Sequence, residues 1–232
     1  MNKNIREYVK KSADKIKKYS FYNKIVFIKD PLPEYINLLH ILRKIEKLIP
    51  EHFLYNVDGL YIGFYQEFED RDVNALYKDG IIYVSNEQDD NDDMVDDIVH
   101  EISHAFEETY PVEIYGDGSI ENEFLKKRVH FSFLADYEGY KIEKSKISNL
   151  DYDREFDEIL YQDIGYDKIL PLTHNLFINP YALTSIREYF ATGFEEHYLG
   201  EKDFLKKISP SIYKKIYELE NLKDEDVQHY EI

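Results

Sequence analysis

The segment His100-Glu101-Ile102-Ser103-His104 carries the residues best suited to chemistry in this sequence. On a helix, two histidines at positions i and i+4 lie one turn apart on one face, so both imidazoles can reach a single tetrahedral zinc ion. Glu101 between them can lie beside the metal-bound water and take its proton. We therefore expect His100 and His104 to be zinc ligands and Glu101 to be a general base.

A catalytic zinc site of this type needs a third protein ligand, and two glutamates are candidates. Positions 107 and 110 hold Glu107 and Tyr110, which excludes the pattern that supplies a third histidine directly after the motif. The first candidate, Glu123, follows His104 by nineteen residues and belongs to an Asn-Glu pair. That spacing resembles the aminopeptidase and thermolysin-like zinc enzymes, whose third ligand is such a glutamate.

The second candidate for the third ligand is Glu188. Asn179 can cap a helix and Pro180 suits its first position, so we expect a helix over 180–198. Seven residues are nearly two helical turns, which puts Tyr181 on the same face as Glu188. A phenol in the same cavity could donate a hydrogen bond to the oxyanion of a tetrahedral intermediate.

Two separated patterns together resemble a known family. HEISHAFEE and the downstream pattern Tyr-x6-Glu-Tyr-Phe-Ala-x-x-Phe are similar to the anthrax-lethal-factor-like zinc metallopeptidases, which include the Pro-Pro endopeptidases. The resemblance covers about 85–110 and 175–198. It implies a zincin fold of the gluzincin type and a set of roles: zinc ligands His100, His104 and Glu188, general base Glu101 and oxyanion donor Tyr181.

The chain departs from the family in the interval of 84 residues between His104 and Glu188, which is longer than expected. An inserted helical pair within 121–165 would account for the extra length. The insertion also keeps Glu123 open as the alternative third ligand.

The elements that must position these residues follow from the periodicity of the apolar residues. It predicts helices over 4–19, 33–49, 91–109, 121–138, 153–164 and 180–198, with two shorter ones after 201. It predicts strands over 24–29, 53–67 and 75–86, the last with a hairpin turn at Lys78-Asp79-Gly80. Strands precede helices, so we expect an α+β fold without βαβ alternation.

We expect a single zincin-like catalytic domain over 1–232. Residues 1–109 would supply a small N-terminal mixed sheet and the active-site helix, and 110–232 would form a mainly helical part that supplies the third ligand. The acidic residues 89–93 complement the dipole at the start of the active-site helix. Asp97 could orient a ligand imidazole, although a place in the acidic first turn explains it equally well.

A substrate strand is also expected next to the active-site helix. In zinc peptidases of this class an edge strand pairs with an extended substrate by strand addition. The candidate is the strand within 81–86, with Tyr83, Val84 and Ser85 as substrate-binding residues.

Composition narrows the class of protein. With 29 Lys+Arg against 47 Asp+Glu, the net charge of −18 argues against capture of nucleic acid or anionic lipid. The chain has no cysteine, so the ligands of a metal are limited to histidines and carboxylates. No signal peptide or transmembrane run is evident, which makes a cytoplasmic or virion-associated protein the expectation.

The combined expectation is an endopeptidase with one catalytic Zn²⁺ and a protein or peptide as substrate. Three alternatives stay open. The first is a non-catalytic zincin-fold protein that serves as a virion component or regulatory partner. The second is a zinc hydrolase that acts on a non-peptide bond. The third is an aminopeptidase or thermolysin-like enzyme with Glu123 as its third ligand.

Overall fold

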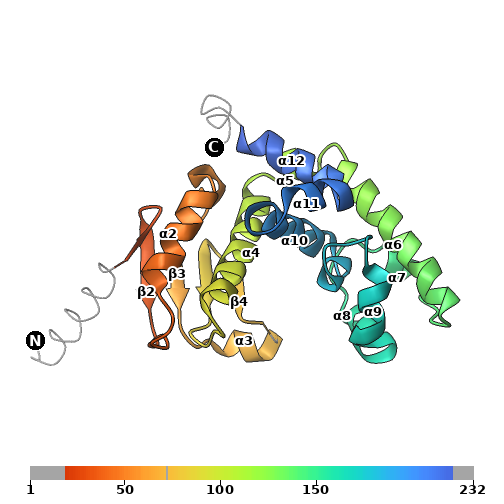
Figure 1. Cartoon of the computed structure of the whole chain (residues 1–232), viewed down its shortest axis with the longest axis horizontal. Helices are drawn as coiled ribbons and strands as arrows, with labels where there is room; N and C mark the ends of the chain where they lie inside the picture. Colours follow the sequence, from red (N-terminus) through yellow and green to blue (C-terminus); the bar gives the residue numbers. More distant parts are fainter. Residues whose placement is uncertain (1–18, 72, 222–232) are drawn as a thin grey trace, which may run out of the picture. The chain divides into compact units, whose positions relative to one another are not determined.

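The computed structural model describes residues 19–71 and 73–221, and the chain divides into two compact units between Thr109 and Tyr110 (Figure 1). The sequence placed the boundary between the sheet-bearing and helical parts at the same residue. That both parts act as one catalytic domain stays a prediction. The helix expected over 4–19 lies outside the described residues except for its last position.

The N-terminal unit combines a five-stranded sheet with helices. Its elements are β1 (Ser20–Phe21), β2 (Lys24–Ile28), α2 (Leu38–Leu48), the 3₁₀ helix η1 (Glu51–Leu54), β3 (Gly59–Ile62), α3 (Gln66–Arg71), β4 (Ala75–Lys78), β5 (Ile81–Val84) and α4 (Asn91–Thr109). The helix predicted over 91–109 is confirmed at both ends by α4. The α+β class and the small mixed sheet are confirmed as well.

The strand order of the sheet is β1-β2-β3-β5-β4. The three inner strands β2, β3 and β5 are parallel to one another, and the two outer strands β1 and β4 run antiparallel to their neighbours. Parallel neighbours cannot be joined by a tight turn, so the chain crosses from β2 to β3 through α2. The predicted α+β order thus includes one βαβ crossover that the sequence did not indicate.

The predicted hairpin turn at 78–80 is confirmed between β4 and β5. Asp79 and Gly80 both have positive φ angles, 50° and 79°, as the favoured two-residue hairpin turn requires. A Cβ on Gly80 would lie 2.9 Å from a carboxylate oxygen of Asp58. This position therefore favours glycine for both its backbone angle and its limited space.

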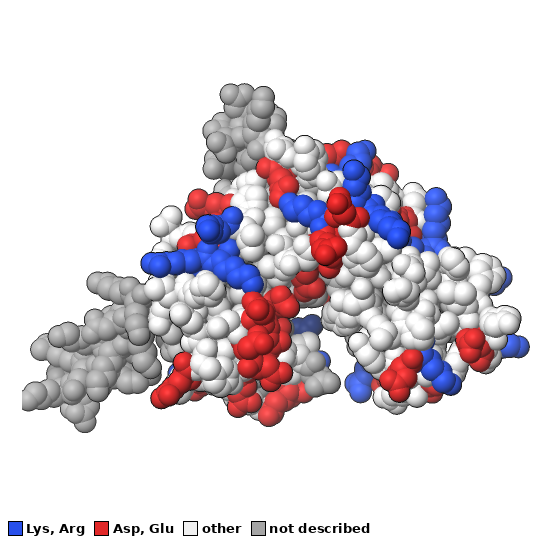
Figure 2. Space-filling view, in the orientation of Figure 1, with Lys and Arg blue, Asp and Glu red and all other residues white. Residues whose placement is uncertain are grey.

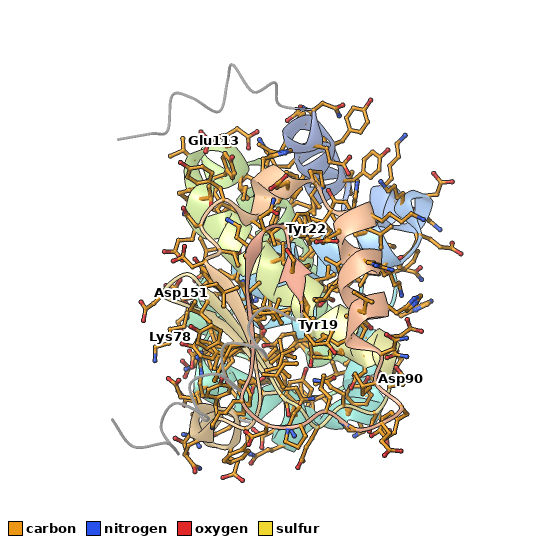
Figure 3. All side chains as sticks on the ribbon, turned by 90° about the vertical axis from the view of Figure 1, so that its left-hand side faces the viewer. Tyr19, Tyr22, Lys78, Asp90, Glu113 and Asp151 are labelled. Atoms are coloured by element: carbon orange, nitrogen blue, oxygen red, sulfur yellow. The ribbon has the colours of Figure 1, made fainter. Side chains whose placement is uncertain are left out.

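Helices α2 and α4 cover one face of the sheet (Figure 1). The side chains of the strands that face them are fully buried: Val26, Leu60, Ile62, Ile82 and Val84. Tyr22 follows β1 and joins the strands to α2, because its hydroxyl donates to the carbonyls of Ile45 (3.0 Å) and Ile49 (2.7 Å). Figure 3 shows Tyr22 between the first strands and this helix.

Two predicted elements of this unit differ from the observed ones. The helix expected over 33–49 starts only at Leu38, because the Asn37 side chain caps it by accepting from the His40 amide at 3.2 Å. Of the strand expected over 53–67, only β3 is extended. The apolar residues alone do not distinguish a strand from a 3₁₀ turn, because Phe53 and Leu54 of η1 are buried like the residues of β3.

In the described part of the C-terminal unit, all regular secondary structure is helical. Its elements are α5 (Pro111–Tyr115), α6 (Ser119–Tyr137), α7 (Lys144–Ser148), α8 (Arg154–Glu158), the π-helical segment η2 (Ile159–Gly165), α9 (Tyr166–Thr173), the 3₁₀ helix η3 (Pro180–Leu183), α10 (Ile186–Leu199), α11 (Lys202–Ile208) and α12 (Pro210–Glu220). The helix expected over 121–138 corresponds to α6, and the two short helices expected after 201 are α11 and α12.

Aromatic side chains dominate the core of this unit. The rings of Phe124, Phe177 and Tyr189 lie 5.3 to 6.3 Å apart and join α6 to α10. The helix expected over 153–164 is divided into α8 and η2, and Gly165 with a φ of 86° separates it from α9. The long interval before Glu188 thus contains α6, α7, α8 and α9.

Candidate metal centre

Helix α4 carries the predicted metal ligands, and its first turn explains the acidic patch. The Asp90 carboxylate accepts hydrogen bonds from the backbone amides of Asp92 (2.8 Å) and Asp93 (3.0 Å), which is the arrangement of an N-cap. Asp92 also forms an ion pair with Lys44 of α2 at 2.7 Å. Acidic side chains gather in a band on the N-terminal unit in Figure 2. The patch at the start of α4 therefore has a structural role.

The two histidines of the motif converge. Their Nε2 atoms lie 3.2 Å apart. Two nitrogen ligands of a tetrahedral zinc ion, each at about 2.05 Å from the metal, would lie about 3.3 Å apart. The spacing of His100 and His104 thus matches two neighbouring positions of a tetrahedral zinc site.

Glu107 holds one of these imidazoles in place. Its carboxylate lies 2.9 Å from Nδ1 of His104, and both side chains are buried. A carboxylate accepts from a protonated Nδ1, so this contact leaves the Nε2 lone pair of His104 available on the side of His100. This role of Glu107 was not predicted, although the His-x-x-Glu spacing on one helix indicates it.

The partner predicted for a ligand imidazole, Asp97, has a different contact. Its carboxylate accepts a hydrogen bond from the Gln88 side chain at 2.9 Å. Burial raises the pKa of Asp97 to about 6, with neighbouring carboxylates adding to the rise. His100 acts electrostatically on the same carboxylate and opposes this rise. Glu107 thus orients His104, and a role of Asp97 in orienting His100 stays a prediction.

Glu101 lies at the free edge of the sheet. Its carboxylate accepts a hydrogen bond from the backbone amide of Tyr77 in β4 at 2.5 Å. Because Ser85 donates to the Asn74 carbonyl, the antiparallel ladder turns the amide and carbonyl groups of Ala75 and Tyr77 away from β5. The expected base therefore sits where an added strand would pair with β4.

The predicted substrate strand is wrong. Tyr83 and Val84 lie in β5, which is paired on both sides with β3 and β4, and the Ser85 amide donates to Asn74. None of these backbones lies at an edge. In the β4–β5 hairpin, β5 pairs with β3, so β4 is the edge strand and lies next to α4. The sequence of a two-residue turn does not show which of the two hairpin strands lies at the edge of the sheet.

In the C-terminal unit, Tyr181 and Glu188 lie on two separate elements. The Asn179 side chain caps η3, which contains Tyr181, and the Ser185 hydroxyl caps α10 by accepting from the Glu188 amide at 3.1 Å. The single helix expected over 180–198 is therefore wrong, and with it the helical argument for a shared face. The spacing Ser185-x-x-Glu188 is that of a capping box and marked the new helix start.

Arg128 of α6 fixes the turn between these two elements. Its guanidinium is fully buried and donates to the carbonyls of Leu183 (3.0 Å), Thr184 (3.3 Å) and Asn149. It also lies over the rings of Phe124 and Phe156. Burial lowers the pKa of Arg128 to about 10. One side chain from a distant helix thus anchors the residues directly before α10.

Glu123 is already engaged inside the C-terminal unit. One carboxylate oxygen accepts from the Tyr189 hydroxyl at 2.6 Å, and the other accepts from the Ser211 amide at 3.0 Å. These bonds join α6 to α10 and α12. Burial, with the nearby Glu123 carboxylate, raises the pKa of Tyr189. A metal at Glu123 would have to break contacts that hold three helices together. His130 and His174 of this unit are exposed.

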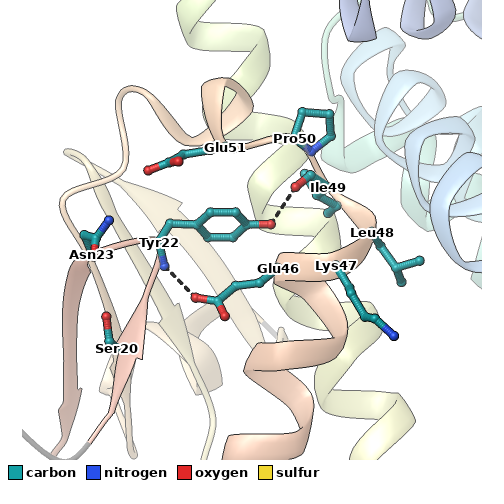
Figure 4. Close-up of a pocket in the computed structure, with 9 residues that line it drawn as sticks. All are labelled: Ser20, Tyr22, Asn23, Glu46, Lys47, Leu48, Ile49, Pro50 and Glu51. Atoms are coloured by element: carbon teal, nitrogen blue, oxygen red, sulfur yellow. Dashed lines mark hydrogen bonds between the residues drawn. The ribbon is translucent and has the colours of Figure 1, made fainter.

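An open pocket of about 570 Å³ lies elsewhere in the N-terminal unit, between the β1–β2 turn and the end of α2 (Figure 4). Glu46 in its wall accepts from the Tyr22 amide at 2.9 Å. The pocket is lined by Ser20, Tyr22, Asn23, Glu46, Lys47, Leu48, Ile49, Pro50 and Glu51, and none of these residues was predicted to take part in chemistry.

Comparison with known families, with curated proteins and with solved structures found no match to this chain. Within the described residues, no helix has both the length and the apolar character that a membrane span requires.

Proposed function

We propose that the chain is a zinc-dependent endopeptidase in which His100, His104 and Glu188 hold the metal. The observation that carries the proposal is the convergence of the two Nε2 atoms at 3.2 Å, with Nδ1 of His104 held by the buried Glu107. Two imidazoles and one carboxylate are a ligand set of catalytic zinc sites, and each of the three residues offers one suitable atom.

The choice of Glu188 rests on what the other candidate does. Both oxygens of Glu123 accept hydrogen bonds inside the C-terminal unit. Glu188 lies in the first turn of α10, where its backbone amide donates to the Ser185 hydroxyl. The proposal assigns its carboxylate to the metal because Glu188 belongs to the possible ligand group with His100 and His104.

The proposed mechanism is hydrolysis of a peptide bond by water. Zinc bound at these residues would polarise the scissile carbonyl and lower the pKa of water. Glu101 takes the proton of the attacking water and passes it to the leaving amine. The phenol of Tyr181 donates a hydrogen bond to the oxyanion of the tetrahedral intermediate.

An extended peptide is the substrate form that suits the sheet edge. The outward amide and carbonyl of Ala75 and the carbonyl of Tyr77 are available for strand addition to β4. The Tyr77 amide donates to Glu101 instead. A substrate paired with β4 would therefore pass directly beside the base.

The decisive experiment compares wild type with Glu101→Gln in zinc content and in cleavage of a peptide library. Loss of a general base is expected to lower the cleavage rate by about 10²–10⁴-fold with zinc content unchanged. Glu108→Gln, which alters an exposed carboxylate of the same helix, is the matched control and should retain activity. Equal cleavage by Glu101→Gln and wild type would overturn the mechanism.

A second experiment tests the third ligand. Zinc affinity is measured by competition with a chelator for Glu188→Ala and Glu123→Ala. We expect Glu188→Ala to lose tight zinc binding, and Glu123→Ala to keep it while losing conformational stability. The reverse result would identify Glu123 as the ligand. Tight zinc binding by a wild-type protein that cleaves no peptide would favour the non-catalytic alternative.

A further inference from the structure

Helix α6 carries a row of exposed apolar side chains. Val129, Phe133 and Tyr137 follow one another at four-residue intervals and are 44 %, 70 % and 88 % exposed. The buried face of the same helix is formed by other residues, namely Ile120, Phe124, Arg128, Phe131 and Ala135. The row is therefore an additional apolar face of α6, outside the core of the C-terminal unit.

The exposed row is large for a protein surface. Burying its three side chains would remove on the order of 400 Å² of surface from water, since one aromatic side chain buries about 150–250 Å². A patch of this size is comparable to the largest apolar patch on a typical monomer, and such patches often have a function.

We propose that the row is a homodimer interface in which α6 packs antiparallel against α6 of a second copy. A two-fold interface uses the same patch on both subunits, so the patch must complement its own reversed copy. With the axis near residue 131, Val129 lies opposite Phe133, and Leu125 lies opposite Tyr137. Side chains spaced by four residues form the ridges that interdigitate in the commonest helix packing.

The charges beside the row fit the same register. Reversal about residue 131 brings Lys126 opposite Asp136, and both are exposed positions of α6. The two-fold axis repeats this pair, so opposite charges meet on both sides of the apolar centre. No like charges face each other at these positions. This charge complementarity favours a second copy over a partner of uniform charge.

The expected dimer is weak. Its apolar contact of about 400 Å² per copy is roughly half of the ~800 Å² that each partner buries in a standard stable interface. Association should therefore depend on concentration in the micromolar range and above. It should also be independent of zinc, because the row is separate from the proposed ligands.

Sedimentation velocity of the full chain in the presence of a chelator tests the proposal. Wild type is expected to shift from monomer to dimer between about 1 and 500 µM, and Phe133→Asp is expected to remain monomeric throughout. Val112→Asp alters another exposed apolar residue of the same unit, 73 % exposed, and should dimerise like wild type. A wild type that stays monomeric, or a Phe133→Asp protein that dimerises equally well, overturns the proposal.

Charge reversal tests the antiparallel register. Lys126→Glu and Asp136→Lys should each weaken the dimer by about tenfold, because each change places two like-charged pairs across the axis. The double variant restores opposite charges and should dimerise within about threefold of wild type. A double variant as weak as the single ones would exclude this register. Because these positions are exposed, circular dichroism of each variant should match wild type.

Discussion

Helix α4 of the N-terminal unit, which carries the proposed histidine ligands, and the Tyr181–Glu188 segment of the C-terminal unit are held in place in different ways. In α4, the motif and the carboxylate that orients His104 belong to eight consecutive residues, with Glu107 only one turn beyond the histidine. The Tyr181–Glu188 segment depends on Arg128, whose guanidinium binds carbonyls 55 and 56 residues away.

This difference shows where each half of the proposed site is vulnerable. A short helical motif needs only its helix, so changes in α4 should affect metal affinity more than folding. The turn before α10 is anchored by Arg128 of α6, so it forms only when these two helices are packed together. Changes there should affect folding first and the metal only as a consequence.

The largest expected effect comes from removing the anchor of the C-terminal unit. Arg128→Met leaves the buried carbonyls of Leu183, Thr184 and Asn149 without their donor and should cost about 3 kcal/mol of unfolding free energy. Urea denaturation measures the loss. Hydrogen exchange should show reduced protection at the start of α10 and unchanged protection in α4.

The control for Arg128 is Arg154→Met, which removes an exposed guanidinium paired with Glu158. Such a surface change should stay within about 0.5 kcal/mol of wild type. If Arg128→Met costs as little as this control, the turn before α10 does not depend on the anchor, and the contrast between the two units fails.

A smaller effect is expected at the local support of the N-terminal unit. Glu107→Ala leaves Nδ1 of His104 without its acceptor and should lower zinc affinity by about 10–100-fold. Glu107→Gln keeps an acceptor oxygen and should recover part of the loss. Cobalt substitution gives an independent measurement, because the visible spectrum of the bound ion reports on ligand geometry.

Glu108→Ala serves as the control here, since it removes an exposed carboxylate from the next position of α4. It should bind zinc like wild type. Equal affinities for wild type and Glu107→Ala would show that the imidazole of His104 is positioned without the carboxylate.

The smallest effect concerns pH and the half-buried Asp97. Its pKa in the folded protein is raised to about 6, above its value in the unfolded chain, so the folded state binds the proton more tightly. The stability that this proton contributes is present below about pH 4 and is lost as the pH rises through 6. Asp97→Asn cannot ionise. Between pH 4 and 7 the metal-free wild type should therefore lose about 2 kcal/mol relative to this variant.

Denaturation at several pH values measures this difference, with the exposed Asp96→Asn as control. A difference between wild type and Asp97→Asn that is constant across the pH range would contradict the shifted pKa. Chelator is present throughout, so that metal binding does not contribute to the measured stability.

The sequence by itself determined the helix 91–109, the convergence of the two histidines on it, the hairpin at 78–80, and the α+β order. These features depend on contacts within a few residues of the chain, where helical periodicity and turn chemistry decide the structure. The same local logic failed over 53–67 and 180–198. Over 53–67 the apolar run is compatible with a strand or with a buried 3₁₀ helix. Over 180–198 the N-cap at Asn179 is compatible with a long α-helix or with a short 3₁₀ helix.

Only the tertiary structure decided which strand is the edge, which carboxylate is engaged and what anchors α10. β4 is outermost because of how the hairpin joins the parallel strands. Glu123 is occupied because Tyr189 and Ser211 approach it from helices 66 and 88 residues further along the chain. Contacts of this separation arise when the units fold and bury their cores, so no spacing within one segment of the sequence can reveal them.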